Sequence, residues 1–430
     1  MRNDPRSHGL WEASAPPAPH TPPLERAIEV DVAIVGGGFT GLSAALHLQE
    51  KGARTAVLEG AEIGFGGSGR NVGLVNAGMW VMPSALSGAL GGLHGARLLT
   101  QLGAGPDLVY ALIERHGIDC EAVRNGTLHC AVGASGLANI RQRATEWQAH
   151  GAPVRLLSAE ETAERTGTRA YTGALLDQRA GTVQPLAYAR GLAHAAQRAG
   201  AALHGHDRVV SAEDQGSHWL LRTDTGGTVA AQWVVAATNT FTEAAGPFTA
   251  IREEQVRLPY FNMATPPLPR ALRERILPGL EGVWDTPDVL TSFRIDRAGR
   301  LVFGSVGALR GSGAAIHQDW GRRAMAKLFP ALRGTGFDYA WYGWIGMTSN
   351  SLPRFHRLAR NTVSFSGYNG RGIATGSVFG RELARLITGE IADADLALPV
   401  TVPETPRFRG AREAWYEAGA QIAHVAGARF

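Results

Sequence analysis

Three glycines and one acidic residue have the types and spacing of a site for a diphosphate. Gly36, Gly38 and Gly41 follow an apolar run at 30–35, and Glu59 ends the next apolar run. In such a G-x-G-x-x-G pattern the first glycine permits a tight turn, the second lets backbone approach a pyrophosphate, and the third lets a helix pack on a strand. The start of that helix offers free N–H groups and about half a positive charge to phosphates. Because the Glu59 carboxylate could accept both hydroxyls of a ribose, the unit predicts a dinucleotide site.

The unit alone does not separate FAD from NAD, since both carry an adenosine diphosphate, and a plain glycine-rich turn remains its alternative. The next stretch, "GGSGRNVGLVNAG" at 66–78, is too glycine-rich for a helix and too polar for a buried strand. Gly73 and Gly78 would let backbone lie close to a flat ring. The stretch therefore favours FAD, whose longer chain runs on to such a ring, over a bland surface loop. Its donors for phosphate and ribityl oxygens are Ser68, Gly69, Arg70 and Asn71.

Two later stretches fit the same cofactor. "TVAAQWVVAATNTF" is predicted to be a strand that reaches Thr238 and Asn239, and polar residues after a strand mark the ligand-binding edge of an open α/β sheet. "TVSFSGYNGRGIATGSVFGRELARLITGE" is predicted to be a strand, a glycine loop and a helix starting near Gly372 and Ile373. The positive end of that helix would suit the N1–C2=O edge of a reduced, anionic flavin. The residues expected to hold the cofactor are Gly36, Gly38, Phe39, Thr40, Gly41, Glu59, Gly67, Ser68, Gly69, Arg70, Asn71, Val72, Gly73, Val209, Thr238, Asn239, Gly367, Asn369, Gly370, Gly372 and Ile373.

The composition is that of a globular protein with a full core. The 430 residues are 44% hydrophobic and 19% charged, and a net charge of +4 is too mild to indicate a nucleic-acid partner. Cys120 and Cys130 are the only cysteines, so neither a disulfide framework nor a metal site is expected. The sequence has no run of about 18 consecutive apolar residues, so no membrane span is expected. With no signal-peptide core near the N-terminus, we expect a cytoplasmic protein.

With these stretches in hand, the chain resembles the FAD-dependent oxidoreductases of the D-amino-acid-oxidase-like superfamily. The matching segments are "GLWEAS", "VAIVGGGFTGLSAALHL", "GFGGSGRNVGLVNAG", "DQRAGTVQPLAYARGLAHAA", "VVAATNTF" and "GYNGRGIATGSVFGRELARLITGE", from about residue 9 to residue 390. Within the superfamily, "GGSGRNVGLVNAGMW" and "WDTPDVLTSFRIDRAGRLVFGSVG" are most similar to the branch of bacterial L-pipecolate oxidases and γ-glutamylputrescine oxidases.

The resemblance implies an α/β fold. A Rossmann-like FAD-binding domain, at 28–85, 180–245 and 338–400, would be interleaved with an α+β substrate domain at 86–179 and 246–337. The substrate domain would be built on a mixed, largely antiparallel sheet. An N-terminal arm would occupy 1–27, and an amphipathic C-terminal helix is predicted in 401–430.

The resemblance also implies an activity, the oxidation of a small amino or cyclic imino acid, with L-pipecolate as the first candidate. The substrate amine loses its proton, a hydride passes from the adjacent C–H to flavin N5, and an imine results. One alternative is a γ-glutamylputrescine-type amine oxidase. Others are a flavin dehydrogenase, which passes electrons to a quinone or protein partner instead of oxygen, and a flavoprotein subunit of a larger enzyme.

A substrate carboxylate needs a fixed cation, and the planar fork of arginine binds carboxylates bidentately. Arg294 is the candidate, because it lies in the apolar strand pattern "LTSFRIDRAGRLVFG", where an arginine is costly unless paired. The alternatives for Arg294 are a structural ion pair and a solvated edge. Tyr260, Trp344 and Tyr368 are candidate walls of the substrate pocket, and each is alternatively simple core.

The chain departs from some relatives of this superfamily. Several of them bind FAD covalently through histidine or cysteine, but the 64–78 loop has no histidine and both cysteines are distant in sequence, so noncovalent FAD is expected. Neither Lys51 nor Lys327 is placed like the lysine with which some relatives activate oxygen. Where relatives often carry a Thr-x-Asp pattern, this chain has 348–350 as Thr-Ser-Asn, and the lost charge would alter amine recognition.

Overall fold

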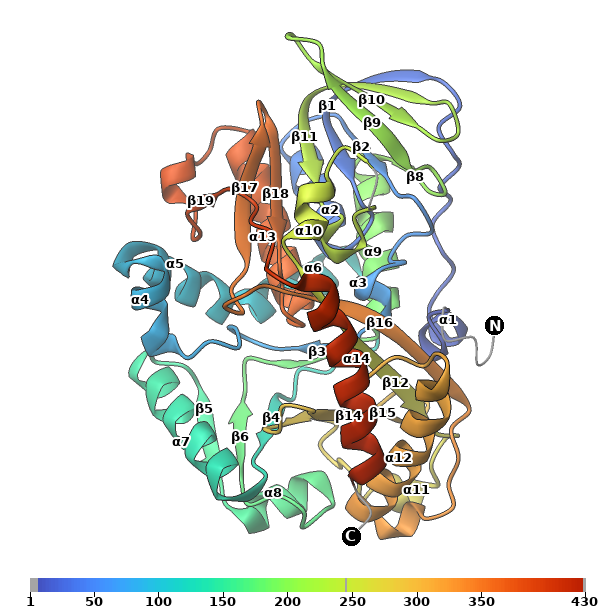
Figure 1. The fold of residues 1–430 in the computed structure, drawn as a ribbon, viewed down its shortest axis with the longest axis vertical. Coiled ribbons are helices and arrows are strands. Elements are labelled where there is room, and N and C mark those ends of the chain that lie inside the picture. Colours follow the sequence, from blue (N-terminus) through green and yellow to red (C-terminus); the bar gives the residue numbers. More distant parts are fainter. Residues whose placement is uncertain (1–6, 244–245, 428–430) are drawn as a thin grey trace.

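The computed structural model describes residues 7–243 and 246–427, which form two layered halves, each built around one large sheet (Figure 1). The first sheet has the order β19-β17-β18-β11-β1-β2-β8, and the β9–β10 hairpin adds to β11. Its central strands pair in parallel and are buried on both faces, as their continuous apolar runs require. The strands are β1 (Ala27–Val35), β2 (Thr55–Leu58), β8 (Ala202–His204), β9 (Val209–Asp214), β10 (Trp219–Thr223), β11 (Thr228–Ala236), β17 (Arg354–Ala359), β18 (Thr362–Ser366) and β19 (Val400–Thr401).

Three helices pack together on the first sheet: α2 (Phe39–Glu50), α9 (Pro185–Arg198) and α13 (Gly372–Ile387). α2 connects β1 to the parallel strand β2, and it lies against both α9 and α13. The helices α2 and α13 therefore start at the same edge of the sheet, where the parallel strands end.

The second sheet has the order β16-β12-β15-β14-β13-β4-β6-β5 and is antiparallel except for the β4–β13 pair. It is thus the mixed, largely antiparallel sheet that was expected. One face packs on α12 (Ser312–Leu328) through a core that includes Phe261, Phe293 and Phe303, and the other face is turned toward the first half. The strands are β4 (Thr127–Cys130), β5 (Val154–Leu157), β6 (Ala174–Asp177), β12 (Val256–Ala264), β13 (Gly282–Asp285), β14 (Thr291–Ile295), β15 (Leu301–Val306) and β16 (Tyr339–Met347).

One expected domain boundary, at residue 338, differs in the structure. β16 was assigned with 338–400 to the FAD-binding domain, but it pairs with β12 along its whole length, from Tyr339 to Met347. The reason is that its backbone hydrogen bonds are satisfied by a strand of the second sheet, so the crossing back to the first sheet comes only at β17. The rest of the division into domains stays a prediction.

The two ends of the chain pack against these halves. In the N-terminal arm, α1 (Leu10–Ser14) buries Trp11 completely, and its indole Nε1 donates to the Asn71 carbonyl oxygen at 2.8 Å. The expected C-terminal helix is α14 (Arg409–Ala426), which crosses the face seen in Figure 1. Among the described residues, no helix has the length and apolar character needed to cross a membrane.

The stretch 66–78 contains a four-residue helix, although its glycines argued against one. The turn of α3 (Gly67–Arg70) is tolerated because the Asn71 side chain closes its C-terminal end on two carbonyl groups. The remaining elements are β3 (Leu74–Val75), η1 (Pro83–Ala85), α4 (Leu86–Leu90), α5 (Gly92–Gly103), α6 (Gly105–His116), α7 (Gly133–Ala149), α8 (Ala159–Thr166), β7 (Gly181–Thr182), η2 (Asn239–Phe241), α10 (Thr249–Glu253), α11 (Arg270–Arg273), η3 (Pro330–Leu332) and η4 (Asp393–Asp395).

Candidate active site

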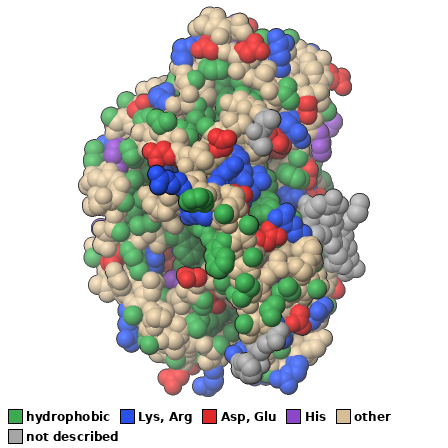
Figure 2. All heavy atoms as spheres, viewed as in Figure 1, with side chains coloured by type: hydrophobic (Ala, Val, Ile, Leu, Met, Phe, Trp, Pro, Cys, Tyr) green, Lys and Arg blue, Asp and Glu red, His purple; other side chains and the backbone are tan. Residues whose placement is uncertain are grey.

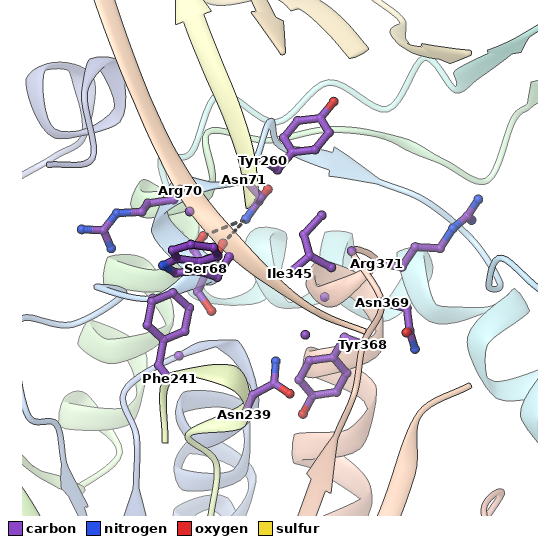
Figure 3. A pocket seen from close by; sticks show the side chains of 18 of the residues that line it. Ser68, Arg70, Asn71, Asn239, Phe241, Tyr260, Ile345, Tyr368, Asn369 and Arg371 are labelled. Carbon is purple, nitrogen blue, oxygen red and sulfur yellow. Dashed lines mark hydrogen bonds between the residues drawn. The ribbon is translucent and has the colours of Figure 1, made fainter. Parts of the chain in front are cut away.

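A cavity of about 630 Å³ lies between the ends of the first sheet's strands and the inward face of the second sheet. Side chains from both halves surround it (Figure 3). The residues predicted to hold the cofactor that line it are Gly36, Gly38, Phe39, Thr40, Glu59, Gly67, Ser68, Arg70, Asn71, Val72, Val209, Thr238, Asn239, Asn369, Gly370, Gly372 and Ile373. The other four, Gly41, Gly69, Gly73 and Gly367, lie behind this lining.

The glycine turn before α2 has the conformation that a dinucleotide requires. Gly36 has φ +112°, and a Cβ there would lie 2.8 Å from the Ala237 carbonyl oxygen. A Cβ at Gly41 would clash with the Gly36 carbonyl oxygen, so the third glycine serves the packing of helix on strand, as predicted. Gly38 caps α2 without a side chain, which leaves the positive end of the helix facing the cavity.

Glu59 follows the last residue of β2 and lines the cavity beside this turn. Its Oε2 accepts from Gly37 N at 2.7 Å, and its Oε1 accepts from Ala61 N at 3.0 Å. Burial raises the pKa of Glu59, while these two backbone hydrogen bonds act in the opposite direction. Each carboxylate oxygen has a second lone pair, so the carboxylate can still accept ribose hydroxyls. At the start of α2, Phe39 N donates to Ser68 Oγ at 3.1 Å. This helix end, with its glycine N-cap, and the Glu59 carboxylate fit the adenosine diphosphate half of FAD.

The 66–78 stretch is shaped mainly by contacts within the protein. Asn71 Nδ2 donates to the carbonyl oxygens of Gly67 and Ser68, both at 2.9 Å (Figure 3), and Asn71 Oδ1 accepts from Gly73 N. A Cβ at Gly73 would clash with the Val183 carbonyl oxygen, and one at Gly78 with the Trp147 ring. These two glycines therefore allow close packing of protein on protein, which corrects the expectation that they lie against a flat ring.

The loop before α13 is tied to the other cofactor segments. Asn239, at φ +48°, accepts from Gly367 N through its Oδ1 at 2.9 Å. The Tyr368 hydroxyl lies 2.7 Å from Thr40 Oγ1 and donates to the Phe365 carbonyl oxygen. Tyr368 thus lines the cavity with a hydroxyl that is already engaged, so it fits a wall better than a proton-transfer group.

The second sheet contributes the other wall. Tyr260 of β12 and Ile345 of β16 line the cavity (Figure 3), and the Tyr260 hydroxyl lies 2.6 Å from Ser292 Oγ. Trp344 borders the cavity, but its indole faces the other side of the sheet, between Arg257 at 5.8 Å and Arg310 at 5.4 Å from the ring. Alternation along β16 turns Trp344 away where it turns Ile345 inward.

The structure places Arg294 outside the cavity, which corrects its expected role as a substrate ligand. It shares a face of β14 with Ser292, but Gly73 backbone lies over its guanidinium. The fully buried side chain donates to the Val183 carbonyl oxygen and lies 3.7 Å from the Glu121 carboxylate. Arg294 therefore has the structural ion-pair role that was its alternative.

A group of residues that the sequence did not single out forms one end of the cavity, which we call the aromatic chamber: Trp80, His129, Arg143, Trp284 and Arg371. The two indoles meet edge to face at 5.0 Å, and His129 stacks on Trp284 at 3.5 Å. Burial, with the charges of both arginines, lowers the pKa of His129 well below its usual value, so it is neutral near pH 7. Arg371 lies inside a predicted cofactor motif, so it could have been singled out from the sequence. Arg143 lies in α7, and nothing in the sequence around it indicates a functional role.

Other predicted features lie away from the cavity. Neither lysine lines it, and Lys51 pairs with Glu390. Asn350 closes a turn and accepts from Arg354, so the altered 348–350 pattern adds no charge to the cavity. The two cysteines are buried free thiols outside the lining, and no group of metal-ligating side chains occurs within residues 7–243 and 246–427.

The chain matches the sequence model of the DAO family, FAD dependent oxidoreductase, over residues 31–386. It belongs to this family. The protein is therefore an FAD-dependent oxidoreductase of the class that acts on amines and amino acids, and the resemblance drawn from its motifs is confirmed.

Similar proteins agree with this assignment. The chain is 33% identical to γ-glutamylputrescine oxidoreductase of Escherichia coli K12 over 377 residues, 85% of each protein. The glycine oxidase structure from Geobacillus kaustophilus superposes with a TM-score of 0.68 at 23% identity, covering 85% of this chain and 96% of that one. L-amino acid deaminase from Proteus myxofaciens gives 0.71 at 17% identity, covering 88% and 94%. These structures confirm the α/β fold of DAO-family enzymes.

Proposed function

We propose that this DAO-family protein is an oxidase of a small amino or cyclic imino acid, L-pipecolate first, that holds FAD noncovalently and releases an imine. The observation that supports it best is the continuity of the cavity: the cofactor segments open directly into an aromatic chamber that carries two cations. A compact apolar wall beside fixed positive charge suits a small ring with a carboxylate.

In this proposal, some of the lining residues bind the cofactor and others orient the substrate. When bound, FAD supplies the hydride acceptor. The glycine turn and Glu59 would hold its nucleotide half, and the loop at the start of α13 would hold its other end. Trp80, Trp284 and Ile345 exclude water and fix the ring of the substrate, while the Tyr260–Ser292 hydroxyl pair offers a hydrogen-bond partner to its nitrogen.

A γ-glutamylputrescine-type amine oxidase is the second candidate, favoured by the 33% identity to the enzyme of that name. The position of the arginines separates the two candidates. Arg371 stands one residue before α13, the helix whose start would face the flavin. A cation carried by this residue would suit a carboxylate on the carbon next to nitrogen, whereas γ-glutamylputrescine carries its carboxylate far from the reacting amine.

Anaerobic titration tests the function. Addition of L-pipecolate should bleach the flavin absorbance near stoichiometric amounts, with γ-glutamylputrescine and L-proline as comparison substrates. Bleaching by γ-glutamylputrescine alone would favour the second candidate. Peroxide formed when air is admitted identifies an oxidase, and bleaching that persists in air until a quinone is added identifies a dehydrogenase. Acid precipitation should leave the yellow cofactor in the supernatant, and colour retained in the pellet would contradict noncovalent FAD.

A further inference from the structure

Arg371 presents a free edge of its guanidinium within the aromatic chamber. Its Nη1 donates to the Ala77 carbonyl oxygen at 2.9 Å, and its Cζ lies 4.9 Å from the rings of both Trp80 and Trp284. Its buried Nε has no hydrogen-bond partner among the described residues. Figure 3 shows the side chain leaving the loop beside Asn369 and extending away from Phe241. The Nε–Nη2 edge is the one with which arginine grips a carboxylate bidentately.

Arg143 reaches the same place from α7. Its side chain is 7% exposed, and its two Nη atoms donate to the carbonyl oxygens of Met79 at 3.3 Å and Trp80 at 2.7 Å. Only its Nε is left without a partner within the described part of the chain. Arg143 can therefore add positive charge and hold the Met79–Trp80 backbone, but it has no free fork.

The two cations have no close anion of their own. Within the described ranges, no carboxylate lies within 4 Å of either guanidinium. The acids that act on them from further away are occupied: Asp177 binds Arg179 at 2.7 Å, and Glu146 accepts from Ser84 N. Burial lowers the pKa of Arg371, and the charge of Arg143 lowers it further. Two buried like charges are costly, and an anion bound between them would relieve that cost.

We propose that the aromatic chamber is a carboxylate-binding subsite in which Arg371 contacts the carboxylate of the substrate and Arg143 is a positioning residue behind it. The proposal rests on the proposed function in one respect, that the substrate is an amino or imino acid. It assigns the role expected of Arg294 to a residue at the start of α13. The subsite distinguishes amino and imino acids from amines that lack a carboxylate.

A purely structural role is the rival explanation, because both arginines bind carbonyl groups of the 77–80 segment. A structural role predicts equal losses for substrates with and without a carboxylate. It also predicts no selective change in the affinity for a carboxylate that cannot be oxidised. Both predictions differ from those of a subsite, so paired ligands can separate the two explanations.

The experiment uses the FAD-loaded full chain with paired ligands. L-pipecolate and piperidine differ only by the carboxylate, and picolinate is a planar carboxylate whose binding is read from the flavin spectrum without turnover. The variants are Arg371→Lys, Arg371→Met and Arg143→Met, with Arg270→Met, an exposed arginine on α11, as the control.

Arg371→Met should weaken picolinate binding and lower kcat/KM for L-pipecolate by about 10–100-fold, and leave piperidine within about 2-fold. Arg371→Lys keeps the charge but loses the fork, so about a 10-fold loss is expected. Arg143→Met should change the same two quantities by about 3–10-fold. Arg270→Met should change neither.

Equal losses for L-pipecolate and piperidine, or unchanged picolinate affinity in Arg371→Lys and Arg143→Met, would overturn the subsite. The proposed function fails separately. If wild type binds picolinate through Arg371 but L-pipecolate does not bleach its flavin, the subsite stands and the proposed substrate is wrong. If L-pipecolate bleaches the flavin of wild type and of every variant with the same dependence on concentration, the function stands and the subsite is wrong.

Discussion

At the scale of single residues, Glu59 is the acidic side chain that we expect to bind the ribose of the cofactor. Two backbone N–H groups fix its carboxylate at the end of β2, at 2.7 and 3.0 Å. Burial raises the pKa of Glu59, because the ionised carboxylate loses part of its solvent. Each further hydrogen-bond donor would therefore stabilise the ionised form. Ribose hydroxyls would supply such donors. The carboxylate is thus positioned before the cofactor arrives, and little ordering is needed on binding.

Glu59→Gln is expected to weaken FAD binding. It exchanges a charge-assisted hydrogen bond, worth about 1.5–3 kcal/mol, for a neutral one, and turns an N–H₂ group toward Gly37 N or Ala61 N. The dissociation constant should rise by about 10–150-fold, measured by titrating FAD into the apoprotein. Glu62→Gln, a nearby acid outside the cavity lining, is the control. An unchanged constant for Glu59→Gln would mean that this carboxylate does not hold the ribose.

Residue by residue, the sequence predicted backbone roles better than side-chain destinations. The glycine pattern and Glu59 were found because their spacing is fixed by local geometry. Arg294 was expected at the substrate because it interrupts an apolar strand, and its β14 register does turn it to the same face as Ser292. The strand pattern does not reveal that the segment at Gly73 covers Arg294, because that contact joins residues far apart in sequence. Arg143 and Arg371, which meet only after folding, could not be paired for the same reason.

At the scale of elements, the crossing of α2 over β1 decides whether a cofactor site exists. Gly41 lies where the helix backbone meets the turn, and a Cβ there would clash with the Gly36 carbonyl oxygen and lie 3.1 Å from Ile34 Cγ2. Tyr368 and Thr40 then join the loop before α13 to the same end of α2. A shift of α2 would therefore displace both halves of the cofactor site.

Gly41→Ala is expected to displace α2 and to cost FAD binding as well as stability. Overpacking at a backbone contact destabilises by about 1–3 kcal/mol, so the thermal midpoint should fall and the purified protein should contain much less flavin. Gly88→Ala, on the exposed helix α4 with no atom near the added Cβ, is the matched control and should be neutral or slightly stabilising. Full flavin content in Gly41→Ala would show that the helix can pack without this glycine.

At the scale of the whole molecule, α14 fastens one half of the fold to the other. Near its start, Glu413 accepts at 2.8 Å from Arg252 of α10, a short helix whose Ile251 packs against the first sheet. Near its end, His424 lies on the second half, with its Nδ1 2.8 Å from His317 Nδ1 of α12. Figure 2 shows hydrophobic side chains near the middle of the face that α14 crosses in Figure 1.

The sequence predicted the whole-molecule plan only as far as local patterns reach. The Rossmann-like unit and the amphipathic C-terminal helix followed from periodicity. The assignment of β16 to the second sheet did not, because an apolar strand pairs equally well with any exposed edge and nothing local selects β12. Nor did it reveal the place of α14 between the halves, which depends on partners more than 100 residues away.

The buried His317–His424 pair predicts how stability depends on pH. Burial lowers the pKa of His317 to about 4 and that of His424 to about 3, so both are neutral in the folded protein. Below about pH 6.5 the unfolded chain binds protons that the folded chain excludes, so stability falls as the pH falls. Because the unfolded histidines are only half protonated at pH 6.5, each histidine contributes about 1.6 kcal/mol between pH 6.5 and 5.

The double variant His317→Gln/His424→Gln should be less stable than wild type at pH 7, because the ring stacking on Phe261 and Trp320 is lost. It should also lose about 3 kcal/mol less stability than wild type on going from pH 6.5 to 5, measured by denaturant unfolding of the FAD-loaded protein. Asp285 has the opposite effect, because burial raises its pKa to about 7, but it is present in both proteins and cancels in the comparison. His150→Gln, at an exposed site, should keep the full pH dependence of wild type. If the free energy of unfolding depends on pH in the same way in the double variant and in wild type, the two histidines are not held neutral in the folded protein. Acid would then not weaken the contact between α14 and α12 through this pair.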